Sequence, residues 1–191
     1  MSTSHTQHFG GRWSAQKLDI LEGYLKGYLS IFHKNARARF FETWYVDCFA
    51  GSGYQGTRNK SDQPWLPGVD VGQVQEYFDG SAARALRLSP GFDKHLFIDA
   101  HNRNVRSLER LRHDYPGDPS NIVVKHGDAN DEVVRWAQAQ DWQRTRAVVF
   151  MDPFGMQVRW STLYALGKTQ GVDLWLLIPF RQAIMRLLQR S

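Results

Sequence analysis

The chain has 191 residues, of which 42% are hydrophobic and 23% are charged, as in a soluble globular protein with one sizeable core. Its net charge of +5 permits a nucleic-acid partner, but an ordinary basic surface explains it equally well. Cys48 is the only cysteine, which excludes an internal disulfide. The polar N-terminus and the short apolar run at 174–180 argue against a signal peptide and a membrane span. We therefore expect a cytoplasmic protein that does not contact a membrane.

The first predicted elements follow a polar stretch, residues 1–15, that we expect to be flexible. Apolar residues then recur at helical spacing and predict an opening amphipathic helix from about Gln16 to His33. Phe41 to Phe49 is the first predicted strand. Residues 54–80 are rich in Gly, Pro, Asn and Asp without a clear period, which predicts a long functional or mobile loop.

From Gly80 onward, predicted strands alternate with predicted helices. The strands cover 95–100, 121–128, 146–155 and 172–180, and the helices cover 81–88, 102–115, 130–139, 160–166 and 182–189. This alternation predicts an α/β fold, a Rossmann-like and mostly parallel sheet with helices on both faces. Residues 16–191 are expected to form this one domain.

Four aspartates stand at the carboxyl ends of predicted strands: Asp47, Asp99, Asp128 and Asp152. In an open α/β sheet the ligand crevice lies outside this edge. The alternative is that each aspartate caps the helix that follows it. Four of them at one edge, beside a glycine-rich loop, favour a cofactor site.

The glycine-rich loop is DCFAGSGYQG, residues 47–56, and it matches the dinucleotide pattern G-x-G-x-x-G. A dinucleotide fold requires this loop to open directly into a helix, with a ribose-binding acid roughly 20 residues later. Here the loop leads into TRNKSDQPWLPG, and the next strand-terminal acid, Asp99, comes much later. Both observations argue against a nicotinamide cofactor. The glycine-rich loop contains no Gly-Lys-Ser/Thr, which excludes a P-loop at this position.

S-adenosyl-L-methionine has no phosphate and does not need a helix at the end of this loop. Its site needs a close backbone loop, a carboxylate for the ribose hydroxyls and a polar group for the adenine amine. Gly51 with Gly53, then Asp99, then Asp128 supply these in chain order. We expect Lys17 to pair with the methionyl carboxylate. The predicted cofactor-binding residues are Lys17, Asp47, Ala50, Gly51, Gly53, Asp99, Asp128 and Ala129.

The same segments resemble motifs of class I methyltransferases. DCFAGSG (47–53) is similar to their first motif, and MDPFG (151–155) is similar to the Asp-Pro-Pro-Tyr/Phe fourth motif of amino-group methyltransferases. The resemblance implies methyl transfer to an amino group, with a nucleobase amine and hence a nucleic acid as a candidate substrate. The catalytic residues that it implies are Asp152, Pro153 and Phe154.

Over about residues 16–180 the chain resembles the three-Cys-motif partner protein family more closely still. The shared features are Lys17 ahead of Ile20-Leu21 and Tyr24-Leu25, YVD with FAG at 45–51, Gly80-Ser81 and DPFG at 152–155. The resemblance implies a protein partner with a cysteine cluster. A non-catalytic partner subunit that keeps the methyltransferase fold is therefore the alternative to an enzyme.

The chain departs from the methyltransferase pattern in three ways. Asp99 stands where Glu is commoner, and the fourth motif has one proline instead of two. The sequence also stops one helix after the fifth strand, so we expect the fold to be truncated before the C-terminal β-hairpin. An unpaired edge at 172–180 would then favour self-association or a partner.

Other reactive or aromatic residues have simpler interpretations. Cys48 is better explained as a small buried residue than as a nucleophile. The seven histidines never stand at metal-ligand spacing from Cys or Glu, so we predict no metal. Trp65 is a candidate base-stacking or lid residue. Four arginines of the 102–115 helix are interpreted as its solvated face, with nucleic-acid contact as the alternative: Arg103, Arg106, Arg110 and Arg112.

Overall fold

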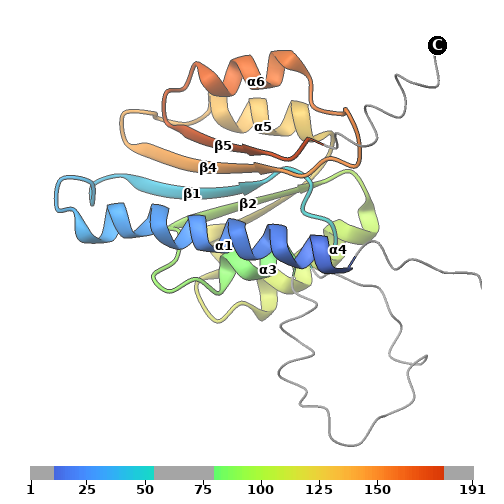
Figure 1. The fold of residues 1–191 in the computed structure, drawn as a ribbon, viewed down its shortest axis with the longest axis horizontal. Helices are drawn as coiled ribbons and strands as arrows, with labels where there is room; N and C mark the ends of the chain where they lie inside the picture. Colours follow the sequence, from blue (N-terminus) through green and yellow to red (C-terminus); the bar gives the residue numbers. More distant parts are fainter. Residues whose placement is uncertain (1–10, 54–79, 179–191) are drawn as a thin grey trace, which may run out of the picture.

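The computed structural model describes residues 11–53 and 80–178, which form one parallel β-sheet between two layers of helices (Figure 1). The strands lie in the order β3-β2-β1-β4-β5, and each neighbouring pair is parallel. Their bounds are Glu42–Asp47 (β1), Lys94–Asp99 (β2), Ile122–His126 (β3), Thr145–Met151 (β4) and Val172–Leu176 (β5). The predicted Rossmann-like α/β fold is confirmed. Strand order reverses between β1 and β4, so the carboxyl edge there is the switch point at which such sheets bind ligands.

The helices divide between the two faces of the sheet (Figure 1). One face carries α1 (Gly11–Lys34), α3 (Ser81–Leu86) and α4 (Asn102–Asp114), and the other carries α5 (Ala129–Gln138) and α6 (Trp160–Gly167). A short 3₁₀ turn, Pro119–Asn121, precedes β3. In the described part of the chain, none of the helices has the length and hydropathy to cross a bilayer.

Alternating strand residues build two separate cores, because successive side chains of a strand point to opposite faces. Tyr45 and Phe97 pack with the apolar stripe of α1, whereas Val46 and Ile98 pack with α5 and α6. All four side chains are fully buried. With both faces covered, the sheet leaves its strand ends as the place for a ligand.

Several element bounds differ from the expectation. Helix α1 begins at Gly11, before the expected Gln16, and β5 ends at Leu176 instead of continuing to 180. The predicted helix at 182–189, most of the predicted loop at 54–80 with Trp65, and residues 1–10 lie outside the described residues. The expected truncation before a hairpin also falls outside them and stays a prediction.

Candidate cofactor-binding and active site

The four aspartates predicted from the sequence do gather at the carboxyl edge of the sheet. Asp47 ends β1, Asp99 ends β2, Asp128 directly precedes α5, and Asp152 directly follows β4. The first three also cap the local backbone, each accepting a hydrogen bond from the N–H two residues later, at Phe49 (3.2 Å), His101 (2.7 Å) and Asn130 (3.0 Å). The capping interpretation therefore applies to the same side chains that converge on the edge.

The glycine-rich loop is fixed to both strands that flank β1. Cys48 N–H donates to the carbonyl of Phe150 (3.0 Å), and Ala50 N–H donates to that of Ile98 (3.1 Å). Gly51 and Gly53 have positive φ angles, 61° and 77°, a conformation that favours glycine. A Cβ on Gly53 would lie 2.9 Å from Leu111 Cδ2, whereas a Cβ on Gly51 would meet nothing within 4 Å. Gly53 is thus needed for packing against α4, and Gly51 borders open space.

Asp47 supports this loop from beneath. Its carboxylate is fully buried and accepts from Phe49 N–H (3.2 Å) and from the Ser81 hydroxyl. Burial raises the pKa of Asp47 to about 7, and the Ser81 hydrogen bond only partly opposes this shift. Asp47 therefore joins the glycine loop to the start of α3 and does not face the cavity described next.

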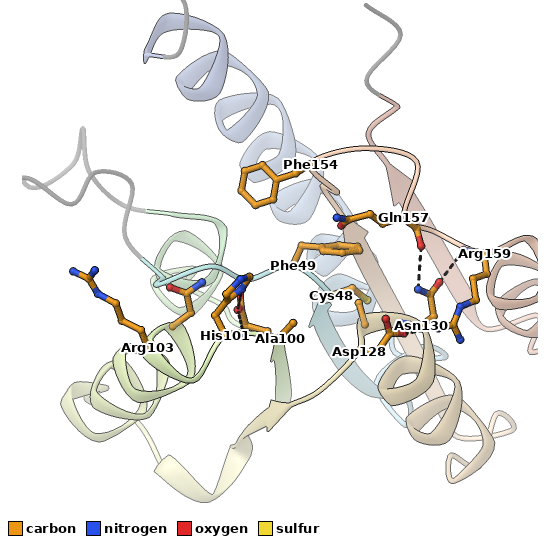
Figure 2. Close-up of a pocket in the computed structure, with 13 residues that line it drawn as sticks. Cys48, Phe49, Ala100, His101, Arg103, Asp128, Asn130, Phe154, Gln157 and Arg159 are labelled. Atoms are coloured by element: carbon orange, nitrogen blue, oxygen red, sulfur yellow. Dashed lines mark hydrogen bonds and ion pairs between the residues drawn. The ribbon is translucent and has the colours of Figure 1, made fainter. Parts of the chain in front are cut away.

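A cavity of about 610 Å³ opens at the carboxyl edge, between the first turns of α4 and α5 (Figure 2). Figure 2 shows Phe49 between Phe154 and Cys48, with His101 and Arg103 to one side and Asp128 and Asn130 to the other. The volume of the cavity is typical of a small-molecule site. The lining residues are Cys48, Phe49, Asp99, Ala100, His101, Arg103, Asn104, Asp128, Ala129, Asn130, Phe154, Gln157 and Arg159.

Asp99 is the buried acid of this cavity. It is 8% exposed, and its two oxygens accept from different backbone groups: Oδ2 from Gly51 N–H (3.0 Å) and Oδ1 from His101 N–H (2.7 Å). The His101 ring, which is largely exposed, lies 3.4 Å from Oδ1. Asp99 thereby ties the glycine loop to the start of α4. Each oxygen has two lone pairs, so Oδ2 keeps one acceptor position for a ligand, and Oδ1 keeps one that a ligand would share with the exposed His101 ring.

Asp128 and Asn130 form the opposite wall. Asp128 contacts Asn130 N–H, Asp131 N–H (3.2 Å) and Arg159 (3.4 Å), all through Oδ1. The Asn130 side chain is 5% exposed; it donates to Gln157 O (3.1 Å) and accepts from Arg159 N–H (2.8 Å) and the Thr162 hydroxyl (2.9 Å). Asn130 therefore anchors the segment after the fourth motif to the cavity wall, a role that the sequence analysis missed.

The Asp-Pro-Phe-Gly segment turns away from β4 beside the cavity. Pro153 is buried and Phe154 is 88% exposed at the cavity mouth. Asp152 forms an ion pair with Lys17 of α1, whereas the sequence analysis expected Lys17 to bind a methionyl carboxylate. This contact fixes the end of β4 to the opening helix.

The structure thus divides the predicted residues into three groups. Asp99, Asp128, Ala129 and Phe154 line the cavity; Asp47, Ala50, Gly51, Gly53 and Pro153 form its support; Lys17 and Asp152 pair outside the lining. Cys48 lines the floor but is 1% exposed, and burial raises the pKa of its thiol well above the usual value, which favours the unreactive form. Within 11–53 and 80–178, His, Cys, Asp and Glu form no group of three or more that could hold a metal ion.

Comparisons with known proteins support only the fold of this chain. No family model and no curated protein matches this chain. The crystal structure of protein LPL1258 from Legionella pneumophila str. Philadelphia 1, described with the family model DUF519, is 16% identical, with a TM-score of 0.62 over 87% of this chain and 68% of that one. The two chains share the fold. Membership of the three-Cys-motif partner family has no support among these comparisons.

Two further solved structures overlap less well. A conserved hypothetical protein of Streptococcus pyogenes is 16% identical over 75% of this chain and 68% of its own, with a TM-score of 0.42. A putative methyltransferase, yhhF from Escherichia coli, is 19% identical over 78% of this chain and 61% of its own, with a TM-score of 0.36. TM-scores this low do not establish a common fold.

Proposed function

We propose that this chain binds S-adenosyl-L-methionine at the carboxyl edge of its sheet and transfers the methyl group to an amino group. The observation that carries the proposal is the cavity of about 610 Å³ in which Asp99 lies against the glycine loop. Its position at the switch point is where sheets of this type bind nucleotides. The resemblance of residues 47–53 and 151–155 to two methyltransferase motifs supports the same reaction.

The residues of the cavity fit this cofactor. The remaining acceptor positions of Asp99 suit the two ribose hydroxyls. Asp128 makes its contacts through Oδ1, so Oδ2 is available to accept from the adenine amine. The open space around Gly51 allows the loop to approach the methionyl part. Phe49 and Ala129 supply apolar surface for the adenine ring.

The fourth-motif residues suit the positioning of a nucleobase amine. When bound, S-adenosyl-L-methionine supplies an electrophilic methyl group. An exocyclic amine is a poor nucleophile, because its lone pair is delocalised into the ring, so acceptors must hold its N–H groups. Asp152 offers a carboxylate oxygen and Pro153 a backbone carbonyl. Phe154, exposed at the mouth, can stack on the base.

A non-catalytic partner subunit is the second candidate. The ion pair between Lys17 and Asp152 favours it, because a carboxylate that already holds an ammonium group has less capacity to accept from a substrate amine. The partner would then be a protein with a cysteine cluster. Both candidate functions include the cofactor site, but only the enzyme would transfer the methyl group of the cofactor to a substrate.

Methyl transfer is tested with cofactor labelled in its methyl group and with pools of RNA, DNA and protein. We expect the wild type to label one pool and Asp152→Ala to reduce the rate by at least about a hundredfold, as for loss of one preorganised polar group. Cofactor binding by Asp152→Ala should persist. Asp114→Ala is the matched control, since Asp114 is exposed at the end of α4. Equal labelling by wild type and Asp152→Ala would contradict the catalytic role of Asp152, and no labelling by the wild type would leave only the partner role.

A further inference from the structure

We propose that the surface around the cavity mouth binds single-stranded nucleic acid. We name this surface the mouth track and define it by six residues: Arg103, Arg106 and Arg110 on α4, Phe154 and Met156 between β4 and α6, and Trp160 at the start of α6. Arg103 and Phe154 line the cavity from its two sides. The inference rests on the proposed function in one respect, that the track would deliver a base to Phe154. Binding itself needs no cofactor.

The basic half of the mouth track is a row of three arginines on α4. Arg103, Arg106 and Arg110 are spaced by three and four residues, so they share one face of α4, and all three are exposed. Arg103 lines the cavity (Figure 2). Within the described residues none of the three has an ion-pair partner, whereas Arg112 pairs with Glu109 at 3.3 Å. Such a row suits the regularly spaced charges of a phosphate backbone.

The aromatic half faces solvent without an apolar cover among the described residues. Phe154, Met156 and Trp160 are 88%, 68% and 78% exposed. Phe154 lines the cavity, and Trp160 directly follows Arg159, another lining residue. Three large exposed apolar side chains within residues 154–160 suit an interaction surface.

The combination of the two halves favours single-stranded nucleic acid over other polyanions. Exposed rings beside cationic groups are the arrangement that proteins use to stack unpaired bases while neutralising phosphates. A duplex keeps its bases stacked on each other and would leave Phe154 and Trp160 unused. An acidic protein would satisfy the arginines but supplies no row of flat rings.

The test is fluorescence anisotropy with a labelled RNA single strand of about 12 nucleotides, within the usual site sizes. We expect Arg103→Ala/Arg106→Ala to weaken binding at least about tenfold and to lower the salt slope by about 0.7 for each phosphate that is no longer neutralised. Phe154→Ala/Trp160→Ala should weaken binding about five- to hundredfold with the slope unchanged. Arg37→Ala is the control, because Arg37 is exposed and precedes the amino end of β1.

Three results would overturn the mouth track. They are equal binding by all four proteins or by none, equal binding of a duplex, and displacement of the RNA by polyglutamate as efficiently as by unlabelled RNA. A parallel titration with S-adenosyl-L-methionine separates the two proposals. If the cofactor binds and the oligonucleotide does not, the proposal for the mouth track is wrong and the proposed function stands. If the oligonucleotide binds and the cofactor does not, the proposal for the mouth track stands and the proposed cofactor site is wrong.

Discussion

Two buried ionisable side chains, Asp47 and His95, act in opposite directions on the pH dependence of folding. Burial raises the pKa of Asp47 to about 7, so between about pH 4 and 7 the folded chain keeps a proton that the unfolded chain releases. Burial lowers the pKa of His95 to about 4, so between about pH 4 and 6.5 the unfolded chain binds a proton that the folded chain lacks. In that shared window the two contributions to stability oppose each other.

Single substitutions should separate the two contributions. The Asp47 carboxyl makes the wild type less stable as the pH rises from about 4 to 7, and Asp47→Asn lacks this effect. The stability of Asp47→Asn relative to the wild type should therefore increase over this range. The His95 imidazole makes the wild type less stable as the pH falls from about 6.5 to 4, and His95→Phe lacks this effect. The stability of His95→Phe relative to the wild type should therefore increase as the pH falls over this range. Each slope is at most about 1.4 kcal/mol per pH unit. Urea unfolding at several pH values measures both, and parallel curves for all three proteins would contradict the assigned pKa shifts.

Among single residues, those that the sequence could identify carry a local signal. Asp99 ends an apolar strand, and Gly51 and Gly53 follow one, so their places could be predicted from the sequence. The pairing of Lys17 with Asp152 could not be anticipated, because the two residues are 135 positions apart and either could bind a ligand instead.

At the scale of elements, Asn130 joins α5 to the segment between β4 and α6. An asparagine in the first turn of a helix usually faces solvent, so the sequence carries no sign of this role. In the structure its buried amide makes three hydrogen bonds across to Gln157, Arg159 and Thr162. The wall of the cavity therefore depends on this one side chain.

Asn130→Ala should lower the free energy of unfolding by about 2–4 kcal/mol, because several buried partners lose their hydrogen bonds together. Thr162→Val is the matched comparison: Thr162 is 1% exposed and its hydroxyl makes one of the three bonds, so the expected loss is about 1 kcal/mol. Urea unfolding of both variants measures this difference. Equal losses in the two variants would mean that the Gln157 and Arg159 bonds add nothing.

The order and type of most elements could be predicted, whereas several bounds could not. The apolar runs at 95–100 and 146–151 are short and β-branched or aromatic, which identifies them as strands. The start of α1 at Gly11 has no such signal, because two glycines and no capping acid stand there. The parallel sheet followed from the general rule for alternating strands and helices. Strand order depends on contacts between distant segments, and it was not predicted from the sequence.

At the scale of the whole molecule, the net charge of +5 indicated only that the chain could bind a polyanion. The structure indicates where we propose that a polyanion binds: Arg103 lines the cavity, Arg106 and Arg110 continue along the same face of α4, and Phe154 is exposed on the other side of the cavity. A cofactor site and an adjoining basic and aromatic surface are the two parts that methyl transfer to a nucleobase requires.

The central claim is that the cavity binds S-adenosyl-L-methionine through Asp99. Isothermal titration calorimetry of the wild type with this cofactor and with its demethylated product tests it most directly, with Asp99→Ala and the control Asp114→Ala. The account predicts that each ligand binds the control with the same affinity as the wild type. Asp99→Ala should weaken the binding free energy of each ligand by about 1.5–3 kcal/mol, the range for hydrogen bonds to a charged group. A folded wild type that gives neither heat nor a thermal shift at millimolar ligand, or an Asp99→Ala protein that binds as the wild type does, would contradict it.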